Sequence, residues 1–137
     1  MKESHKTFDI AVFAGDGIGP EITPPCLEIL KLACQKTGDV ELNFIDVPAG
    51  AALYRDTGTS FPDESKRIAK DADAILLSCM GLPSVRYEDG TEVSPQIDLR
   101  MELGLYAGVR PVRLVPGLDL PLASEKAKEI GLDLIRE

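Results

Sequence analysis

The chain has 137 residues, of which 44% are hydrophobic and 28% are charged, and its formal net charge at pH 7 is −8. This composition is that of an ordinary globular domain, and it excludes a disordered or low-complexity polypeptide. Lys and Arg form no cluster along the sequence, so we expect no nucleic-acid partner.

The sequence shows no signal for membrane insertion or secretion, and its cysteines form no disulfide pattern. The sequence contains no apolar run near the ~20 residues that span a bilayer, and residues 1–7 lack the apolar stretch of a signal peptide. We therefore expect no membrane partner and a cytoplasmic location. The cysteines, Cys26, Cys34 and Cys79, are odd in number and widely spaced, which fits neither a disulfide framework nor a zinc site. We expect them to be buried, unreactive thiols.

The first elements are a strand, a turn and a helix. Residues 7–14 (TFDIAVFA) are short, apolar and partly β-branched, which predicts a buried strand. A glycine-rich turn follows at residues 15–19. Because proline disturbs a helix interior, we expect the regular helix to begin at Pro24, with Thr23 as its N-cap and Gly38 as its C-cap.

Two more strands and two short helices follow. Residues 40–47 (VELNFIDV) alternate apolar and polar side chains, which predicts a strand with one wetter face. Residues 49–54 predict a short helix, and Pro62 with the acids after it opens another. Residues 74–80 (AILLSCM) are almost wholly apolar, which is typical of a parallel strand covered on both faces. This alternation predicts an α/β domain.

The last part of the chain is less regular. Residues 81–95 predict a loop and residues 96–105 a helix, while residues 107–115 and 132–136 predict strands. The sequence stops one residue after the last strand, with no helix to cover it. We therefore expect a truncated fold.

The turn Gly15-x-Gly17-x-Gly19 is the first candidate site. Glycine permits positive φ and close approach of a ligand, and a helix N-terminus attracts anions. The dinucleotide fingerprint would place its third glycine one residue later, and its acid about 20 residues on, whereas Asp46 lies 31 residues after Gly15. The turn alone leaves open a structural role or an ordinary dinucleotide site.

Ordered segments along the chain resemble those of one family. GDGIGPEI at residues 15–22 is similar to its N-terminal signature, and DTGTSFP at residues 56–62 to its D-x-G-T-x-x-P stretch. DAILL at residues 73–77, with Gly81 and Pro83 after it, is similar to its third strand and cofactor-side loop.

The most specific match begins at Leu99. LRMELGLYAGVRP is similar to the motif L-R-x-x-L-x-L-x-A-x-x-R-P, and Pro116-Gly117 and the closing Ile135-Arg136-Glu137 continue the match. From Phe8 onward the chain therefore resembles the β-decarboxylating dehydrogenases, the family of isopropylmalate, isocitrate and tartrate dehydrogenases.

The resemblance implies a fold and its organisation. The expected fold class is α/β, with a mainly parallel sheet and helices on both faces, isopropylmalate dehydrogenase-like and incomplete. Residues 1–104 would form the N-terminal part of the first, cofactor-side domain. Residues 105–137 would form the crossover and the first strands of a truncated second domain. The complete protein would be a homodimer.

The resemblance also implies site residues. Those expected to bind the cofactor are Gly15, Asp16, Gly17, Ile18, Gly81, Leu82 and Pro83. Those expected to bind the substrate are Arg100, Arg110, Arg136, Gln96 and Ile97. The family's catalytic Tyr and Lys, and its metal-binding Asp residues, lie beyond the equivalent of Glu137, so we assign no catalytic base and no metal ligand to this chain.

The arginines suit the implied substrate, a 2-hydroxy dicarboxylate. A guanidinium holds a carboxylate through two parallel, charge-assisted hydrogen bonds. Arg110 and Arg136 lie in otherwise apolar predicted strands, which favours binding over the alternative of solvated surface charge. Arg113 lies three residues beyond Arg110, so the pleat turns it to the opposite face, and we leave it out of the site.

Two departures from the family bear on the substrate. The loop that often reads G-G-P is here Gly81-Leu82-Pro83, and the Leu-Leu pair of isopropylmalate dehydrogenases is replaced by Gln96-Ile97. The resemblance assigns that pair to the pocket for the variable side chain of the substrate. An unpaired amide there is costly to bury against an isopropyl group, so isocitrate, malate and tartrate stay open as substrates.

The implied reaction is oxidation by NAD or NADP followed by loss of CO₂, with Mg²⁺ or Mn²⁺ stabilising the enolate. We expect the metal ligands to lie outside this chain and the chain alone to be inactive. Two alternatives stay open, a non-catalytic module that binds a nucleotide or dicarboxylate, and a regulatory partner that completes its fold against another chain.

Overall fold

The computed structural model describes residues 6–115, 117 and 130–136. It divides the chain into two compact units, Met1–Leu103 and Gly104–Glu137, called here the first and second unit. Each unit is described by itself. The expected organisation of the whole protein into two domains stays a prediction.

The first unit is built on a parallel sheet. Strands β1 (Lys6–Phe13), β2 (Val40–Asp46) and β3 (Ala74–Leu77) are arranged in the order β2-β1-β3, and β1 is parallel to both neighbours. The register pairs Ile10 with both Phe44 and Ala74. These are the three apolar segments from which the sequence predicts a mainly parallel sheet, and that prediction is confirmed.

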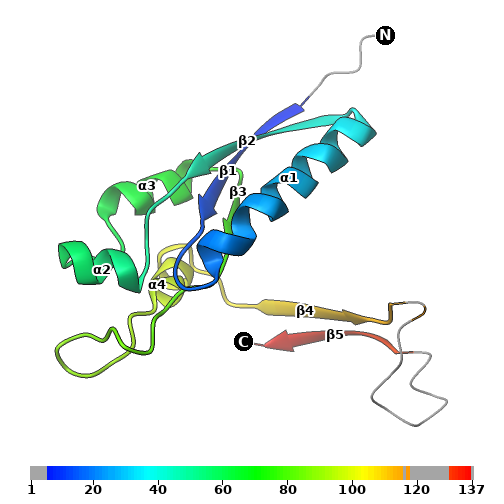
Figure 1. Cartoon of the computed structure of the whole chain (residues 1–137). Helices are drawn as coiled ribbons and strands as arrows, with labels where there is room; N and C mark the ends of the chain where they lie inside the picture. The colour runs from blue at the N-terminus through cyan, green and yellow to red at the C-terminus, as the bar shows by residue number, and fades with distance from the viewer. Residues whose placement is uncertain (1–5, 116, 118–129, 137) are drawn as a thin grey trace. The chain divides into compact units, whose positions relative to one another are not determined.

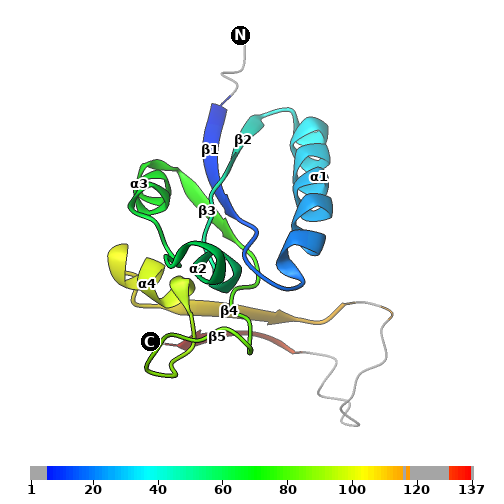
Figure 2. The ribbon, with the colours of Figure 1, turned by 60° about the vertical axis from the view of Figure 1, so that its left-hand side comes forward.

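Helices lie on both faces of this sheet. Helix α1 (Gly19–Thr37) covers one face, and helices α2 (Ala51–Thr57) and α3 (Asp63–Asp71) lie on the other (Figures 1 and 2). Helix α4 (Pro95–Glu102) packs through Leu99 into the same core as α3. The arrangement is the expected α/β architecture.

The core lies between the sheet and the helices α2 to α4. Phe13 and Phe61 are its aromatic centre, with ring centroids 6.0 Å apart in an edge-to-face contact. The other buried members of this cluster are Ala11, Val47, Ala49, Ala69 and Leu99. Burial of each large side chain contributes about 1.5–3 kcal/mol, so these contacts hold the loops between the elements in place.

The expected start of α1 is wrong. The helix begins at Gly19, with Pro20 in its first turn, and Pro24 and Pro25 lie inside it. Thr23 is not an N-cap, because its hydroxyl donates to the Gly19 carbonyl oxygen at 2.7 Å. The first turn needs no internal N–H partner, so the helix can form before the prolines. The expected end is confirmed, since Gly38 has φ 79° and donates to Cys34 O.

Residues 74–80 and the cysteines are less buried than the sequence predicts. Strand β3 stops at Leu77 and lies at the edge of the described sheet, with Ala74 and Leu77 exposed. Cys26 and Cys79 are also exposed, and Cys34 is half-buried. An apolar segment is buried only when other elements cover it, and the described residues leave this edge uncovered.

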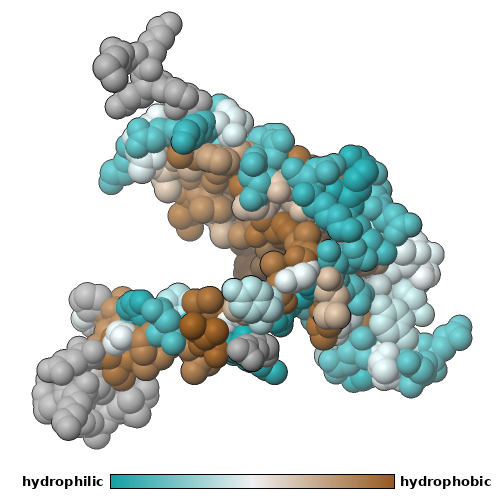
Figure 3. Space-filling model, turned by 180° about the vertical axis from the view of Figure 1, so that it is seen from behind, coloured by the Kyte–Doolittle hydropathy of each residue, from teal (hydrophilic) through white to brown (hydrophobic). Residues whose placement is uncertain are grey.

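The second unit is a two-stranded antiparallel ribbon. Strands β4 (Gly108–Arg113) and β5 (Gly131–Arg136) confirm the two strands predicted there. Exposed apolar side chains of the ribbon include Val109, Leu134 and Ile135. Apolar surface also gathers between polar regions on the face of the first unit seen in Figure 3. A lone two-stranded ribbon is marginal in water, so the ribbon needs further contacts for stability.

Candidate functional site

The glycine turn after β1 is shaped by close backbone contacts. Gly15 has φ 69°, and a Cβ at this position would overlap the carbonyl oxygen of Cys79. A Cβ at Gly19 would overlap the carbonyl oxygen of Ala14. Gly17 has φ 59° but open space around it, with the nearest side-chain atom, from Leu82, at 4.0 Å. Gly15 and Gly19 are therefore required by the fold, while the backbone at Gly17 stays accessible beside Leu82.

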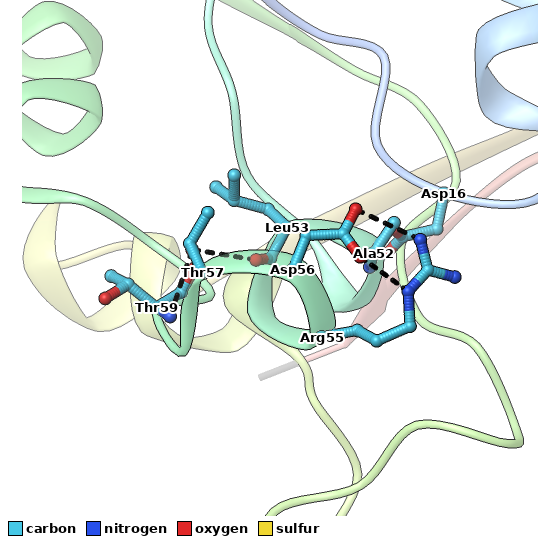
Figure 4. A network of polar contacts seen from close by, with 7 residues as sticks. All are labelled: Asp16, Ala52, Leu53, Arg55, Asp56, Thr57 and Thr59. Atoms are coloured by element: carbon cyan, nitrogen blue, oxygen red, sulfur yellow. Dashed lines mark hydrogen bonds and ion pairs between the residues drawn. The ribbon is translucent and has the colours of Figure 1, made fainter.

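Asp16 is buried where the loop after β1 meets the first residues of α2 and the loop after β3. Its carboxylate accepts hydrogen bonds from the N–H groups of Ala51 at 2.7 Å, Ala52 at 2.8 Å and Gly81 at 2.8 Å, and its side chain lies beside Ala52 in Figure 4. Its own N–H donates to the carbonyl oxygen of Cys79 at 2.7 Å. The residue is 3% exposed. The carboxylate is thus occupied by contacts to the backbone, and the expected role of Asp16 in cofactor binding stays a prediction.

The ion pair next to this junction is a surface feature. Arg55 Nε donates to Asp56 Oδ1 at 2.7 Å (Figure 4), and hydrogen bonds from Arg55 hold the pKa of Asp56 below its usual value. Both side chains are more than half exposed. Such pairs contribute little to stability, and we assign this one no place in the site.

One pocket brings two predicted groups together. It has a volume of about 230 Å³ and is lined by Gly81, Leu82 and Pro83 from the cofactor-side loop and by Gln96 from α4. Met80, Glu92, Val93 and Ser94 complete its lining. Sequence patterns indicate no role for these four residues, because Met80 ends a predicted strand and the other three lie in a predicted loop without a recognisable spacing.

The substrate residues predicted on α4 lie on one side of the helix. Gln96 and Arg100 are four residues apart, so they are neighbours on the helix surface, and Ile97 is 57% exposed beside them. The side-chain oxygen of Gln96 is buried and accepts no hydrogen bond in the structure. The exposed Arg100 makes no ion pair with another described residue. Both side chains therefore have unused hydrogen-bonding capacity.

The ribbon of the second unit presents its arginines on two faces. Gly108 pairs with Arg136 and Arg110 pairs with Leu134, so the side chains of Arg110 and Arg136 point to the same face. Arg113 lies on the opposite face and donates to Asp133 at 2.9 Å. Neither Arg110 nor Arg136 pairs with an acid among the residues that the structure describes. Two free guanidinium groups on one face suit a ligand with carboxylates.

Metal and membrane features are absent from the described part of the chain. Within residues 6–115, 117 and 130–136, no three His, Cys, Asp or Glu side chains are grouped to hold a metal ion. In the same ranges, no helix has the length and apolar character needed to cross a membrane.

Comparison with known proteins decides the family. The sequence profile of isocitrate/isopropylmalate dehydrogenases matches residues 9–137. The chain belongs to the isocitrate/isopropylmalate dehydrogenase family. A 3-isopropylmalate dehydrogenase of Bacteroides fragilis is 37% identical over 135 residues, and one of Desulfitobacterium hafniense is 39% identical over 130 residues. The matches cover 95% and 90% of this chain but only 38% and 35% of those two proteins.

Solved structures of the family agree with the fold. Isocitrate dehydrogenase from Methylococcus capsulatus aligns with a TM-score of 0.69 and 26% identity, covering 95% of this chain and 34% of that one. The apo form of a β-decarboxylating dehydrogenase from Thermococcus kodakarensis aligns with a TM-score of 0.60 and 25% identity, covering 94% and 40%. The isopropylmalate dehydrogenase-like fold is thus confirmed, and the chain spans a little over a third of its relatives.

Proposed function

We propose that the chain forms the cofactor-side part of a metal- and NAD(P)-dependent oxidative decarboxylase of a 2-hydroxy dicarboxylic acid. The observation that supports this proposal is the pocket in which Gly81, Leu82 and Pro83 meet Gln96. In it, the loop expected to contact the cofactor lies against the residue expected to contact the substrate. Hydride transfer requires the two ligands to meet in this way.

In this proposal, each part of the chain binds or orients a ligand. The accessible backbone at Gly17 and the loop from Gly81 to Pro83 hold the dinucleotide. Arg100, and in the complete protein Arg110 and Arg136, hold the substrate carboxylates through paired hydrogen bonds. When bound, NAD(P) supplies the hydride acceptor, and a divalent metal supplies stabilisation of the enolate. The family resemblance implies that the metal ligands lie beyond the equivalent of Glu137, and among the described residues no three His, Cys, Asp or Glu side chains are grouped to hold a metal ion.

We further propose a substrate with a polar substituent. The buried side-chain oxygen of Gln96 lacks a hydrogen-bond donor, and an unsatisfied buried acceptor costs about 1–3 kcal/mol. A hydroxyl on the substrate, or water that the substrate holds, can donate to this oxygen and remove the cost, whereas an isopropyl group cannot. Tartrate, which has a hydroxyl on the carbon that bears the isopropyl group of 3-isopropylmalate, therefore fits this pocket better than 3-isopropylmalate. Malate and isocitrate satisfy the Gln96 oxygen through water.

The test is a substrate panel with protein that spans the full length of the family. We expect NADH or NADPH production with Mg²⁺ or Mn²⁺, and a kcat/KM at least about tenfold higher for a polar substrate than for 3-isopropylmalate. The Gln96→Leu variant should reverse this preference. Absence of dehydrogenase activity with every member of the panel would exclude the function, and preference of the unmodified protein for 3-isopropylmalate would exclude the role of Gln96.

The alternative that we propose is a module that binds a nucleotide or dicarboxylate without turnover. The chain spans 38% of the Bacteroides fragilis relative, so the activity of the relatives is itself a proposal for this chain. Binding of NAD(P) or a dicarboxylate by a protein that never reduces the cofactor would favour the module.

A further inference from the structure

The carboxylate of Asp16 connects parts of the chain that are remote in sequence. It follows β1, whereas its donors belong to the first residues of α2 and to the loop after β3, 35, 36 and 65 positions away. Oδ2 accepts from both Ala51 and Gly81, and Oδ1 accepts from Ala52. A carboxylate this deeply buried is costly unless donors surround it, so the two loops and Asp16 hold one another in place.

The surroundings of Asp16 are built to admit it. Helix α2 has no side-chain cap of its own and no acid in its first turn, so Asp16 satisfies N–H groups that the helix leaves open. Gly50 precedes the helix with φ 135°, and a Cβ there would lie 2.6 Å from both carboxylate oxygens. The absence of a side chain at Gly50 therefore leaves the space that the carboxylate occupies.

The hydrogen bond from Gly81 connects Asp16 to the lining of the candidate pocket. Gly81 has φ 105° and begins the segment Gly81-Leu82-Pro83, which lines the pocket opposite Gln96. Asp16 itself does not line that pocket. Its N–H also bonds to Cys79 O, two residues before Gly81, so the loop is fixed at two points by one residue.

We infer that Asp16 is a positioning residue for the cofactor-side loop. It holds Gly81, and through it Leu82 and Pro83, in the conformation that forms the pocket, and it does not contact the ligand. The link to cofactor binding rests on the proposed function, whereas the link to loop conformation rests on the hydrogen bonds alone. Removal of the carboxylate should therefore loosen this loop and the start of α2 while the parallel sheet stays intact.

Amide hydrogen exchange in the 137-residue chain tests the loop. In Asp16→Ala, the amides of Gly81, Ala51 and Ala52 should exchange at least about tenfold faster, because each loses a bond to a charged acceptor. The amides of Val47 and Ser78, which donate to Val12 O and Phe13 O, are the internal control and should change by less than about twofold. Asp71→Asn, which alters an exposed acid paired with Arg67, should leave all five amides unchanged.

Two further measurements distinguish failure of the positioning role of Asp16 from failure of the proposed function. In the unmodified chain, hydrogen-bond scalar couplings should connect the Asp16 carboxylate carbon to the amide nitrogens of Gly81, Ala51 and Ala52. This measurement does not depend on the folding of any variant.

In protein of full family length, Asp16→Asn should raise KM for the dinucleotide at least about tenfold and change kcat less than about threefold, whereas misfolding lowers kcat at constant KM. Missing coupling to Gly81, or equal acceleration of all five amides, would overturn the positioning role. Full-length protein without dehydrogenase activity would instead overturn the proposed function.

Discussion

At the scale of single residues, the arginines give the most direct test of substrate binding. In protein of full family length, Arg100→Lys and Arg110→Lys should each lower kcat/KM at least about tenfold, because Lys keeps the charge but loses the planar fork. The melting temperature should not change, since both side chains are exposed and unpaired among the described residues. Steady-state kinetics and a thermal melt measure the two effects.

Arg113→Lys is the matched control for the arginine variants. It lies on the opposite face of the ribbon, where it pairs with Asp133, so its replacement should leave kcat/KM within about threefold of the unmodified value. Near-normal kcat/KM in both Arg100→Lys and Arg110→Lys would end the proposal that they hold carboxylates.

A side chain at Gly50, which precedes α2, should lower the stability of the chain. Gly58, which follows α2, provides the comparison. Gly58 ends α2 with φ 79° and has open space around its Cβ position, so Gly58→Ala should cost only the conformational strain of about 1–2 kcal/mol. Gly50→Ala adds overlap with the Asp16 carboxylate and a backbone conformation, φ 135° and ψ 179°, that essentially only glycine adopts, and together these should cost roughly 1–3 kcal/mol more. Urea unfolding of the two variants measures the difference, and equal losses of stability would show that Asp16 does not need this space.

At the scale of elements, one ion pair links α3 to α4. Lys70 Nζ donates to Glu102 Oε2 at 2.7 Å, and this hydrogen bond, with the charge of Lys70, holds the pKa of Glu102 below its usual value of 4.5. Because the pKa is lower in the folded chain than in the unfolded chain, the pair stabilises α4 above pH 4.5. That contribution is lost as the pH falls through the lowered pKa. It is small, since both side chains are more than a third exposed.

Replacement of Lys70 should therefore move the titration of Glu102. In Lys70→Gln, the pKa of Glu102 should rise towards its usual value, as followed by the chemical shift of its carboxyl carbon. Lys36→Gln, in the last turn of α1, should leave that pKa where it is. An unchanged pKa of Glu102 in Lys70→Gln would mean that the pair does not form in solution.

At the scale of the whole molecule, the isolated chain should have no dehydrogenase activity. The isolated 137-residue chain should reduce neither NAD nor NADP with any 2-hydroxy dicarboxylate and Mg²⁺ or Mn²⁺, because it has no match to the family's catalytic Tyr and Lys. Absorbance at 340 nm, read against protein of full family length as the positive control, measures this. Metal-dependent reduction of the cofactor by the pure chain would contradict the expectation.

The sequence by itself determined the local elements and the family. Periodicity and turn chemistry act over a few residues, so Gly38 marks the end of α1 and the apolar runs predict the strands of the sheet. The motif that begins at Leu99 names the family for the same reason, since its residues are close in the chain. The sequence predicts the start of α1 wrongly, because Pro24 and Pro25 signal a helix start although a first turn already precedes them.

Only the tertiary structure decided which remote residues meet. The carboxylate of Asp16 accepts from the N–H groups of Ala51, Ala52 and Gly81, and no spacing in the sequence predicts that meeting. The expected role of Asp16 in cofactor binding stays a prediction. Gln96 lines one pocket with Gly81, and its side-chain oxygen is buried without a hydrogen bond; both are likewise properties of the folded structure around α4. The physical reason is that burial removes water from these polar groups, so their partners are set by the folded backbone around them.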